Sequence, residues 1–265
     1  MAFRLKCRNK FYKSLGQFDA ICEFTEVAVR DFLSNVKSET EFNDLLTEKS
    51  ILHKIKVNAV ELNIFRSRIA QSYILSVYQS FELFLREFKD EHSKLYNDSW
   101  KLPESTHSLL EKTIQKTSSM GKAQSVIGEF RLEIYEYYRL VRNKFAHEYI
   151  KDEKINKAYK NVKNYQNEIA KYYPNLNAPN TFSNICFDDF ILFSRVVKSI
   201  ADGLCDITAP ENEEVFIKYY TTSNKFNKFN ENSKRKRNAI KQDLIENFGA
   251  IDNLDSILYK IVPLV

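Results

Sequence analysis

The chain has 265 residues, of which 43% are hydrophobic and 28% charged, and its formal net charge is +5. This composition is typical of a globular protein with enough residues to bury a core, and it excludes a wholly disordered chain. The first residues, MAFRLKCRNK, contain no apolar signal region, and no later apolar run approaches the length of a membrane span. We therefore expect a cytoplasmic location and no membrane partner.

Breakers of helical structure are few, with only five Gly and five Pro in the chain, which predicts a mostly helical protein. The four cysteines are far apart and form neither a Cys-x-x-Cys motif nor a Cys/His cluster. They are Cys7, Cys22, Cys186 and Cys205. We therefore expect reduced thiols, no metal site and no cofactor.

The first helix is predicted over residues 18–36, where apolar residues recur at helical spacing. The predicted apolar face consists of Ile21, Phe24, Val27, Ala28 and Phe32. The segment 57–96 contains neither Gly nor Pro and repeats apolar residues at intervals of three and four, which predicts one long helix or two nearly continuous ones. A turn containing Pro103 follows it.

Further helices are predicted over 107–115, 130–152, 154–173 and 187–205, with loops at 118–130 and 174–184. The last of these helices has an acidic first turn, which suits the positive end of a helix. A basic linker then leads to two short helices, over 239–249 and 252–265.

The predicted organisation is therefore a helical bundle at 57–205 with additions at both ends. Residues 1–56 form an N-terminal helical extension, and residues 206–265 form the basic linker and the C-terminal helices.

The helix over 130–150 has two distinct faces at roughly 100° per residue. The predicted core face carries Ile134, Tyr138, Val141 and Phe145. The opposite face carries Glu136, Arg139, Asn143 and His147. Arg142 lies on the rim, roughly 140° from His147 around an ideal helix. The two side chains converge only if a shared cleft brings them together, for instance one whose other wall comes from a neighbouring helix or subunit.

Arg142 and His147 suit the cleavage of RNA. A histidine exchanges protons near neutral pH, and it can take the proton of a 2′-hydroxyl or return one to a leaving group. A guanidinium stays charged and forks onto phosphate oxygens as charge builds on them. Because the substrate supplies its own 2′-hydroxyl as nucleophile, this chemistry needs no metal-bound water. The alternative is an ordinary helix with a solvated polar face.

The stretch RNKFAHEY at 142–149 resembles the signature of the HEPN superfamily, in which an Arg, a neighbouring polar residue and a His four to six residues later mark active ribonucleases. Arg142, Asn143 and His147 match that signature. The helix SYILSVYQSFELFLREF, residues 72–88, is similar to the one that packs beside the motif helix in this family. Its embedded acid is Glu82, which is either hydrogen-bonded near the motif or an exposed helix charge.

The resemblance covers about residues 57–205, and it implies an all-α, HEPN-like bundle that forms a homodimer with two motif helices at one cleft. It also implies a metal-independent endoribonuclease, of the kind that serves as a toxin or as an effector in antiphage defence. Inactive members are binding modules. The presence of both Arg142 and His147 favours the active group.

A finer match is to Arg-x4-His-x-Tyr, the form seen in HEPN toxins paired with a small nucleotidyltransferase antitoxin. In those toxins the tyrosine is nucleotidylated to silence the enzyme. Tyr149 holds that position and is either a modification site or a packing aromatic. Arg139 is expected to support the motif from the same face of the helix.

The region 216–241 has eight Lys and Arg against one Glu, and aromatic residues lie among them. Basic groups that neutralise phosphates and aromatic rings that stack on bases are what single-stranded RNA binding requires. The predicted RNA-binding residues are Lys225, Lys228, Lys234, Arg235, Lys236 and Arg237. The alternative is a solvated linker.

Two functions thus follow from the sequence. One is a HEPN endoribonuclease that cuts single-stranded or loop RNA, controlled by an antitoxin, sensor or trigger that acts through the end segments. The other is a HEPN-like scaffold that binds RNA or a partner protein without cutting.

Overall fold

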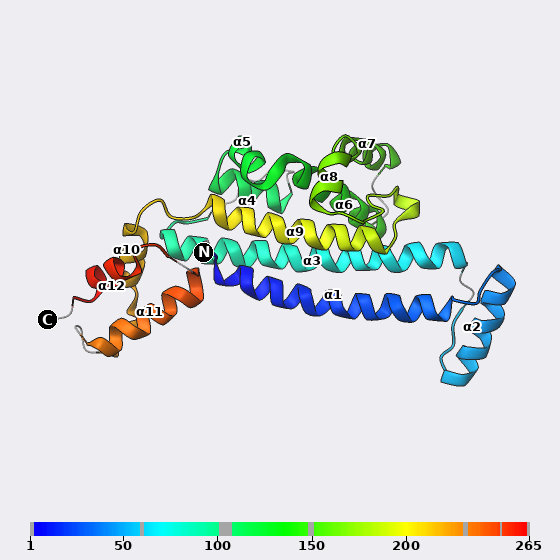
Figure 1. Ribbon diagram of the computed structural model, residues 1–265, viewed down its shortest axis with the longest axis horizontal. Helices are drawn as coiled ribbons and strands as arrows, with labels where there is room; N and C mark the ends of the chain where they lie inside the picture. Colours follow the sequence, from blue (N-terminus) through cyan, green and yellow to red (C-terminus); the bar gives the residue numbers. More distant parts are fainter. Residues whose placement is uncertain are drawn as a thin grey trace. The chain divides into compact units, whose positions relative to one another are not determined.

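The computed structural model describes residues 3–58, 61–100, 108–147, 151–229, 233–249 and 251–263, apart from the side chain of Asn63. Within these ranges every regular element is a helix, so the predicted all-α class is confirmed (Figure 1). The elements run in the order α1 (Lys6–Phe32), α2 (Glu39–His53), α3 (Leu62–Tyr96), α4 (Leu109–Thr117), α5 (Met120–Ala123), η1 (Gln124–Gly128), α6 (Glu129–His147), α7 (Asp152–Lys163), α8 (Gln166–Tyr172), η2 (Phe182–Asn184), α9 (Phe187–Ile207), α10 (Glu214–Thr222), η3 (Asn224–Phe226), α11 (Lys234–Phe248) and α12 (Leu254–Ile261).

The breaker-free segment forms a single continuous helix, α3, of 35 residues. An isolated bridge between Phe3 and Gly249 is the β-type pairing recorded in the described ranges. In the part of the chain that the structure describes, none of the helices combines the length and the apolar character needed to cross a membrane.

The chain divides into two compact units. The first comprises Met1–Lys13, Ser80–Leu132 and Val197–Val265, and the second comprises Ser14–Gln79 and Glu133–Val196. This division differs from the predicted one at 57 and 206, because each unit draws on both 1–56 and 57–205. The start of α1 belongs to the first unit and the rest of it to the second, and the predicted boundaries at 57 and 206 stay predictions.

In the first unit, α1 contacts both α3 and α9. The ring of Phe11 lies 5.0 Å from that of Phe84 on α3. The carboxylate of Asp202 on α9 accepts hydrogen bonds from Arg8 Nε at 2.7 Å and from Tyr12 Oη at 2.7 Å. Apolar burial and a polar clamp thus both hold the start of α1 in this unit.

Two segments of the first unit are more helical than predicted. The predicted loop at 118–130 forms α5 and the π-helical turn η1. The close approach of η1 to α9 depends on Gly203, since a Cβ there would lie 2.6 Å from Ile127 Cγ1. Basic residues 234–237, which were predicted to lie in a linker, form the first turn of α11. Ser233 caps this helix, because its Oγ accepts a hydrogen bond from Lys236 N at 3.1 Å.

In the second unit, α1 buries a different face from the predicted one. Ile21, Phe24 and Val27 are 63%, 75% and 66% exposed. The buried stripe instead follows Leu15, Asp19, Cys22 and Leu33. Because this stripe contains the acidic residue Asp19, the spacing of hydrophobic residues alone does not predict it. Asp19 is nevertheless satisfied, because both its carboxylate oxygens accept from Ser194 Oγ at 2.9 Å.

Helix α6 is buried around most of its circumference in the second unit. Ile134, Tyr138 and Val141 are fully buried, as predicted, and Phe145 is half-buried. Three further residues, predicted to lie off the core stripe, are also buried: Tyr135, Tyr137 and Leu140. The reason is that α6 is packed on several sides, for instance against Tyr78 of α3, whose ring stacks on that of Tyr135 at 6.0 Å.

Candidate functional site

The motif helix α6 is held in place by a buried carboxylate from another helix. Asp189, in the first turn of α9, is fully buried. Its Oδ1 accepts from Tyr138 Oη at 2.7 Å and from Asn180 N at 2.8 Å, and its Oδ2 accepts from Asn180 Nδ2 and Cys186 N at 2.9 Å. Burial, together with this carboxylate, raises the pKa of Tyr138 well above its usual range. The tyrosine is therefore a permanent donor that ties α6 to the start of α9.

The guanidinium of Arg142 is half-buried and has no carboxylate partner among the described residues. Its Nη1 donates to Asn143 Oδ1 at 2.8 Å, and the group lies 4.8 Å from the centre of the Tyr78 ring. Its Nε is buried and has no hydrogen-bond partner. Leaving a buried donor of a charged group unsatisfied costs roughly 1–3 kcal/mol, and among the described residues this cost is not offset by a hydrogen bond to Nε.

Arg139, one turn earlier on α6, makes the opposite arrangement. Its Nε and Nη2 each donate to the Glu136 carboxylate at 2.6 Å in a bidentate pair. The hydrogen bonds with Glu136 raise the pKa of Arg139. Arg139 therefore forms an ion pair within α6, whereas Arg142 forms no ion pair with a described carboxylate. The pair uses two of the five N–H donors of Arg139, and the supporting role predicted for Arg139 stays a prediction.

His147 lies in the last turn of α6 and is exposed. No hydrogen bond joins it to Arg142 in the described part of the chain, as expected from their separation around the helix. Tyr149 lies outside the described residues.

Glu82 is half-buried on α3 and belongs to the first unit, whereas the motif belongs to the second. Both readings of this acid, a hydrogen-bonded group near the motif or an exposed helix charge, stay predictions.

Three aromatic residues of the region 216–241 are buried in the core of the first unit. Phe216, Tyr220 and Phe226 are 4%, 4% and 6% exposed. The ring of Phe216 lies 5.3 Å from that of Phe248, and Tyr220 Oη donates to Asp243 Oδ2 at 2.7 Å. Buried rings cannot stack on bases, so these three do not provide the aromatic part of the predicted RNA-binding tract.

The basic residues of the same tract are placed unequally. Lys225 forms an ion pair with Asp243, and Lys228 lies over the ring of Phe229 at 5.4 Å. Lys234 and Arg235 are exposed, while Lys236 and Arg237 are half-buried. Arg237 lies 3.9 Å from a carboxylate oxygen of Asp255, at the limit of an ion pair. Lys228, Lys234 and Arg235 are therefore exposed and have no ion pair with a described carboxylate.

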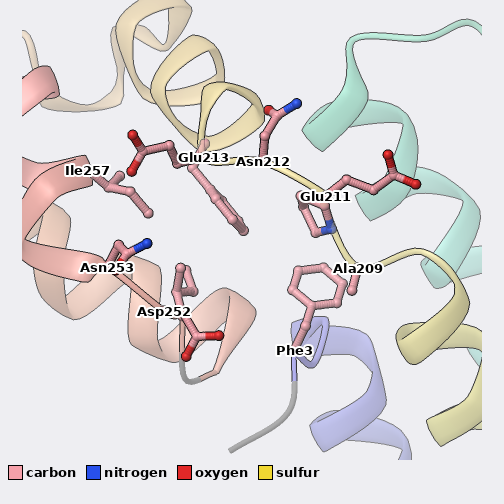
Figure 2. A pocket seen from close by; sticks show the side chains of 11 residues that line it. Phe3, Ala209, Glu211, Asn212, Glu213, Asp252, Asn253 and Ile257 are labelled. Atoms are coloured by element: carbon pink, nitrogen blue, oxygen red, sulfur yellow. The ribbon is translucent and has the colours of Figure 1, made fainter.

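Figure 2 shows a separate hollow in the first unit, with a volume of about 600 Å³. Glu211, Glu213 and Asp252 are among the residues that line it, together with Phe3 and Phe216. Glu213 forms an ion pair with Lys260, which lowers the pKa of Glu213.

Sequence reasoning missed the two residues that shape the motif's surroundings, Tyr78 and Asp189. The acidic first turn of the helix at 187–205 was visible as a signal, but its burial was not. No signal in the sequence pointed to Tyr78 among the many aromatics of α3.

In the described ranges no group of three or more His, Cys, Asp or Glu side chains is placed to hold a metal ion. No family model, curated protein or solved structure matches the chain.

Proposed function

We propose that the protein is a HEPN-type, metal-independent endoribonuclease that cuts single-stranded or loop RNA. The observation that carries this proposal is the state of Arg142, a half-buried guanidinium with an unpartnered Nε and no described carboxylate within reach, on the helix that also presents His147. Unpaired buried charge destabilises a fold, and its usual justification is a functional anion. Arg139 on the same helix, which forms a bidentate ion pair with Glu136, is the internal comparison.

The chemistry assigns a role to each member of the motif. His147 takes the proton of the ribose 2′-hydroxyl, and the 2′-oxygen attacks the adjacent phosphorus as the bond from phosphorus to the 5′-oxygen breaks. Arg142 stabilises the charge on the non-bridging phosphate oxygens. Asn143 orients Arg142 through their 2.8 Å hydrogen bond. The products are a 2′,3′-cyclic phosphate and, once the leaving oxygen gains a proton, a 5′-hydroxyl.

The leaving oxygen needs a proton donor, and the homodimer is proposed to supply it. His147 is exposed at the end of α6, where a second copy has access to it. An isologous contact brings two motifs to one doubly basic cleft, so that one imidazole acts as base and the other as acid. If the site is shared in this way, mixing wild-type chains with an excess of His147→Ala chains lowers cleavage by more than dilution of the wild-type chain accounts for, because a mixed dimer lacks one of the two imidazoles. Light scattering measures the dimer itself.

The direct test is incubation of the purified full chain with RNA in EDTA, followed by analysis of the RNA ends. His147→Ala is expected to reduce cleavage by about 10²–10⁴-fold, and Arg142→Ala by about 10²–10³-fold. His53→Ala is the matched control, because His53 is also exposed in the last turn of a helix of the second unit. Cleavage that needs added metal, or that His147→Ala leaves intact, contradicts the proposal.

The biological setting proposed for this activity is cytoplasmic antiphage defence or a toxin–antitoxin system. A general ribonuclease needs control, which is assigned to an antitoxin, sensor or trigger protein. Expression of the wild-type chain is expected to slow growth in a way that Arg142→Ala abolishes.

The second candidate is a HEPN-like scaffold that binds RNA or a partner without cutting. The observation in its favour is the exposed pair Lys234 and Arg235 at the start of α11. Tight RNA binding with the RNA left whole, lost on substitution of these two residues, favours the scaffold over the enzyme.

A further inference from the structure

We propose that Arg68 of α3 is a second RNA-binding residue, which holds a phosphate next to the one gripped by Arg142. This inference rests on the proposed function. It names a residue outside the sequence motif and a direction for the substrate, across the seam between α3 and α6 in the second unit.

The first support is a reciprocal arrangement of arginines and aromatic rings across this seam. Arg142 of α6 lies over Tyr78 of α3, with its guanidinium carbon 4.8 Å from the ring centre. Arg68 of α3 lies over Phe145 of α6, at 5.6 Å. Each helix thus contributes one guanidinium and one ring, and both distances are within the range of a cation–π contact.

The second support is the closeness of the two positions. Phe145 follows Arg142 by three residues on α6, so the two side chains are neighbours on the helix surface. The ring that Arg68 covers and the residue Arg142 therefore belong to the same part of the seam. Two charged forks along one seam match the repeating phosphates of a nucleic acid strand better than they match an isolated anion.

The third support is that the donors of Arg68 are free while its stem is held. Its recorded polar contact is a long one, from Nη1 to Gln71 Oε1 at 3.5 Å, and no carboxylate pairs with it in the described ranges. Gln71 is 2% exposed and is itself fixed, since its Nε2 donates to the carbonyl oxygen of Phe182 at 2.9 Å. A ring on one side and a fixed amide on the other restrict the guanidinium before RNA arrives, which reduces the entropy lost on binding.

The neighbouring cation on α6 does not take this role. Lys144 forms an ion pair with Asp152 and lies over the ring of Phe182 at 4.9 Å. Its charge is therefore compensated within the chain. Arg68 and Arg142 are left as the two uncompensated arginines of this seam.

The test measures RNA binding by the full-length His147→Ala chain, which holds substrate without cutting it. Fluorescence anisotropy with a labelled single-stranded RNA of mixed sequence gives the dissociation constant over a range of salt concentrations. Adding Arg68→Ala is expected to weaken binding about fivefold to tenfold and to reduce the salt slope by about 0.7, the value for one phosphate contact on a single strand. In the cleaving chain, Arg68→Ala is expected to raise KM with kcat little changed.

Arg66→Ala is the matched control. Arg66 is also exposed on α3, but it points to a different side, where it lines a hollow beside Glu26 and Cys186. Its removal is expected to leave both the affinity and the salt slope unchanged. A structural effect of either substitution appears as a lower Tm without a change in salt slope, and this result for Arg68→Ala overturns the inference.

The outcomes separate this inference from the proposed function. If RNA is cleaved in a manner that depends on His147 and Arg142, but Arg68→Ala behaves like Arg66→Ala, only the role of Arg68 is overturned. If the full chain neither binds nor cleaves RNA, both are overturned. Binding of an acidic peptide such as polyglutamate through Arg68, with no binding of RNA, also overturns it and identifies a protein partner instead.

Discussion

The buried carboxylate of Asp189 offers a sharp test of how α6 is held, through the substitution Asp189→Asn. The change keeps the shape of the side chain but removes its charge and replaces one acceptor with a donor. In the better of its two orientations, the new amide NH₂ takes the place of Oδ1 and faces Tyr138 Oη and Asn180 N. The tyrosine hydroxyl can rotate and accept a hydrogen bond from the NH₂, but the backbone N–H of Asn180 can only donate. One buried N–H is left unpaired, and the remaining hydrogen bonds lose the strength that a charged acceptor gives them.

The expected loss of unfolding free energy is about 4–6 kcal/mol, from roughly 1–3 kcal/mol for the unpaired N–H and about 1 kcal/mol for each remaining bond that becomes neutral. At roughly 2–4 °C per kcal/mol for a chain of this size, Tm falls by about 8 °C or more. Circular dichroism during heating measures the change. Because Tyr138 lies one turn before Arg142 on α6, RNA cleavage is expected to fall as well.

Asp188→Asn is the control for this prediction. Asp188 lies in the same first turn of α9 but is only half-buried, and it accepts one hydrogen bond, from Asn177 N at 2.8 Å. Both substitutions remove one negative charge from the same helix end, so their difference isolates the buried network. The control is expected to lower Tm by about 2–4 °C. Equal effects of the two substitutions would refute the reasoning.

Two further predictions concern the first unit. Gly203→Ala places a methyl group 2.6 Å from Ile127 Cγ1, and it is expected to destabilise the fold by about 1–3 kcal/mol. Gly16→Ala, whose new methyl group has nothing within 4 Å, is expected to stabilise α1 by about 0.5–1 kcal/mol. The Tm values of the two variants should therefore shift in opposite directions. Burial lowers the pKa of His92 from 6.5 to about 4, so its neutral form stabilises the fold above pH 6.5 and this contribution is lost as the pH falls towards 4. His92→Phe keeps a ring between Tyr96 and Trp100, and its Tm should depend less on pH between 7 and 5 than that of the wild-type chain; an unchanged dependence would contradict the assignment.

The sequence by itself determined the helical elements that positioned the motif. The scarcity of Gly and Pro predicted the all-α class, and the absence of breakers over 57–96 predicted the long helix that became α3. Periodicity placed Ile134, Tyr138 and Val141 in the core, since these residues are apolar or aromatic and repeat at the pitch of the helix. Local patterns of this kind suffice wherever burial follows hydrophobic spacing.

Tertiary structure decided which polar groups have partners, because partners come from segments distant in sequence. The stripe of α1 that is buried includes Asp19, whose carboxylate accepts a hydrogen bond from the distant residue Ser194. The aromatics of the region 216–241 look available in the sequence, but three of them pack in the first unit. Arg139 and Arg142 have the same side chain and lie one turn apart. The carboxylate of Arg139 comes from Glu136, three residues earlier on the same helix, so this pair is visible in the sequence. Only the fold shows that the Nε of Arg142 is buried without a hydrogen-bond partner among the described residues, because burial depends on the helices packed around α6.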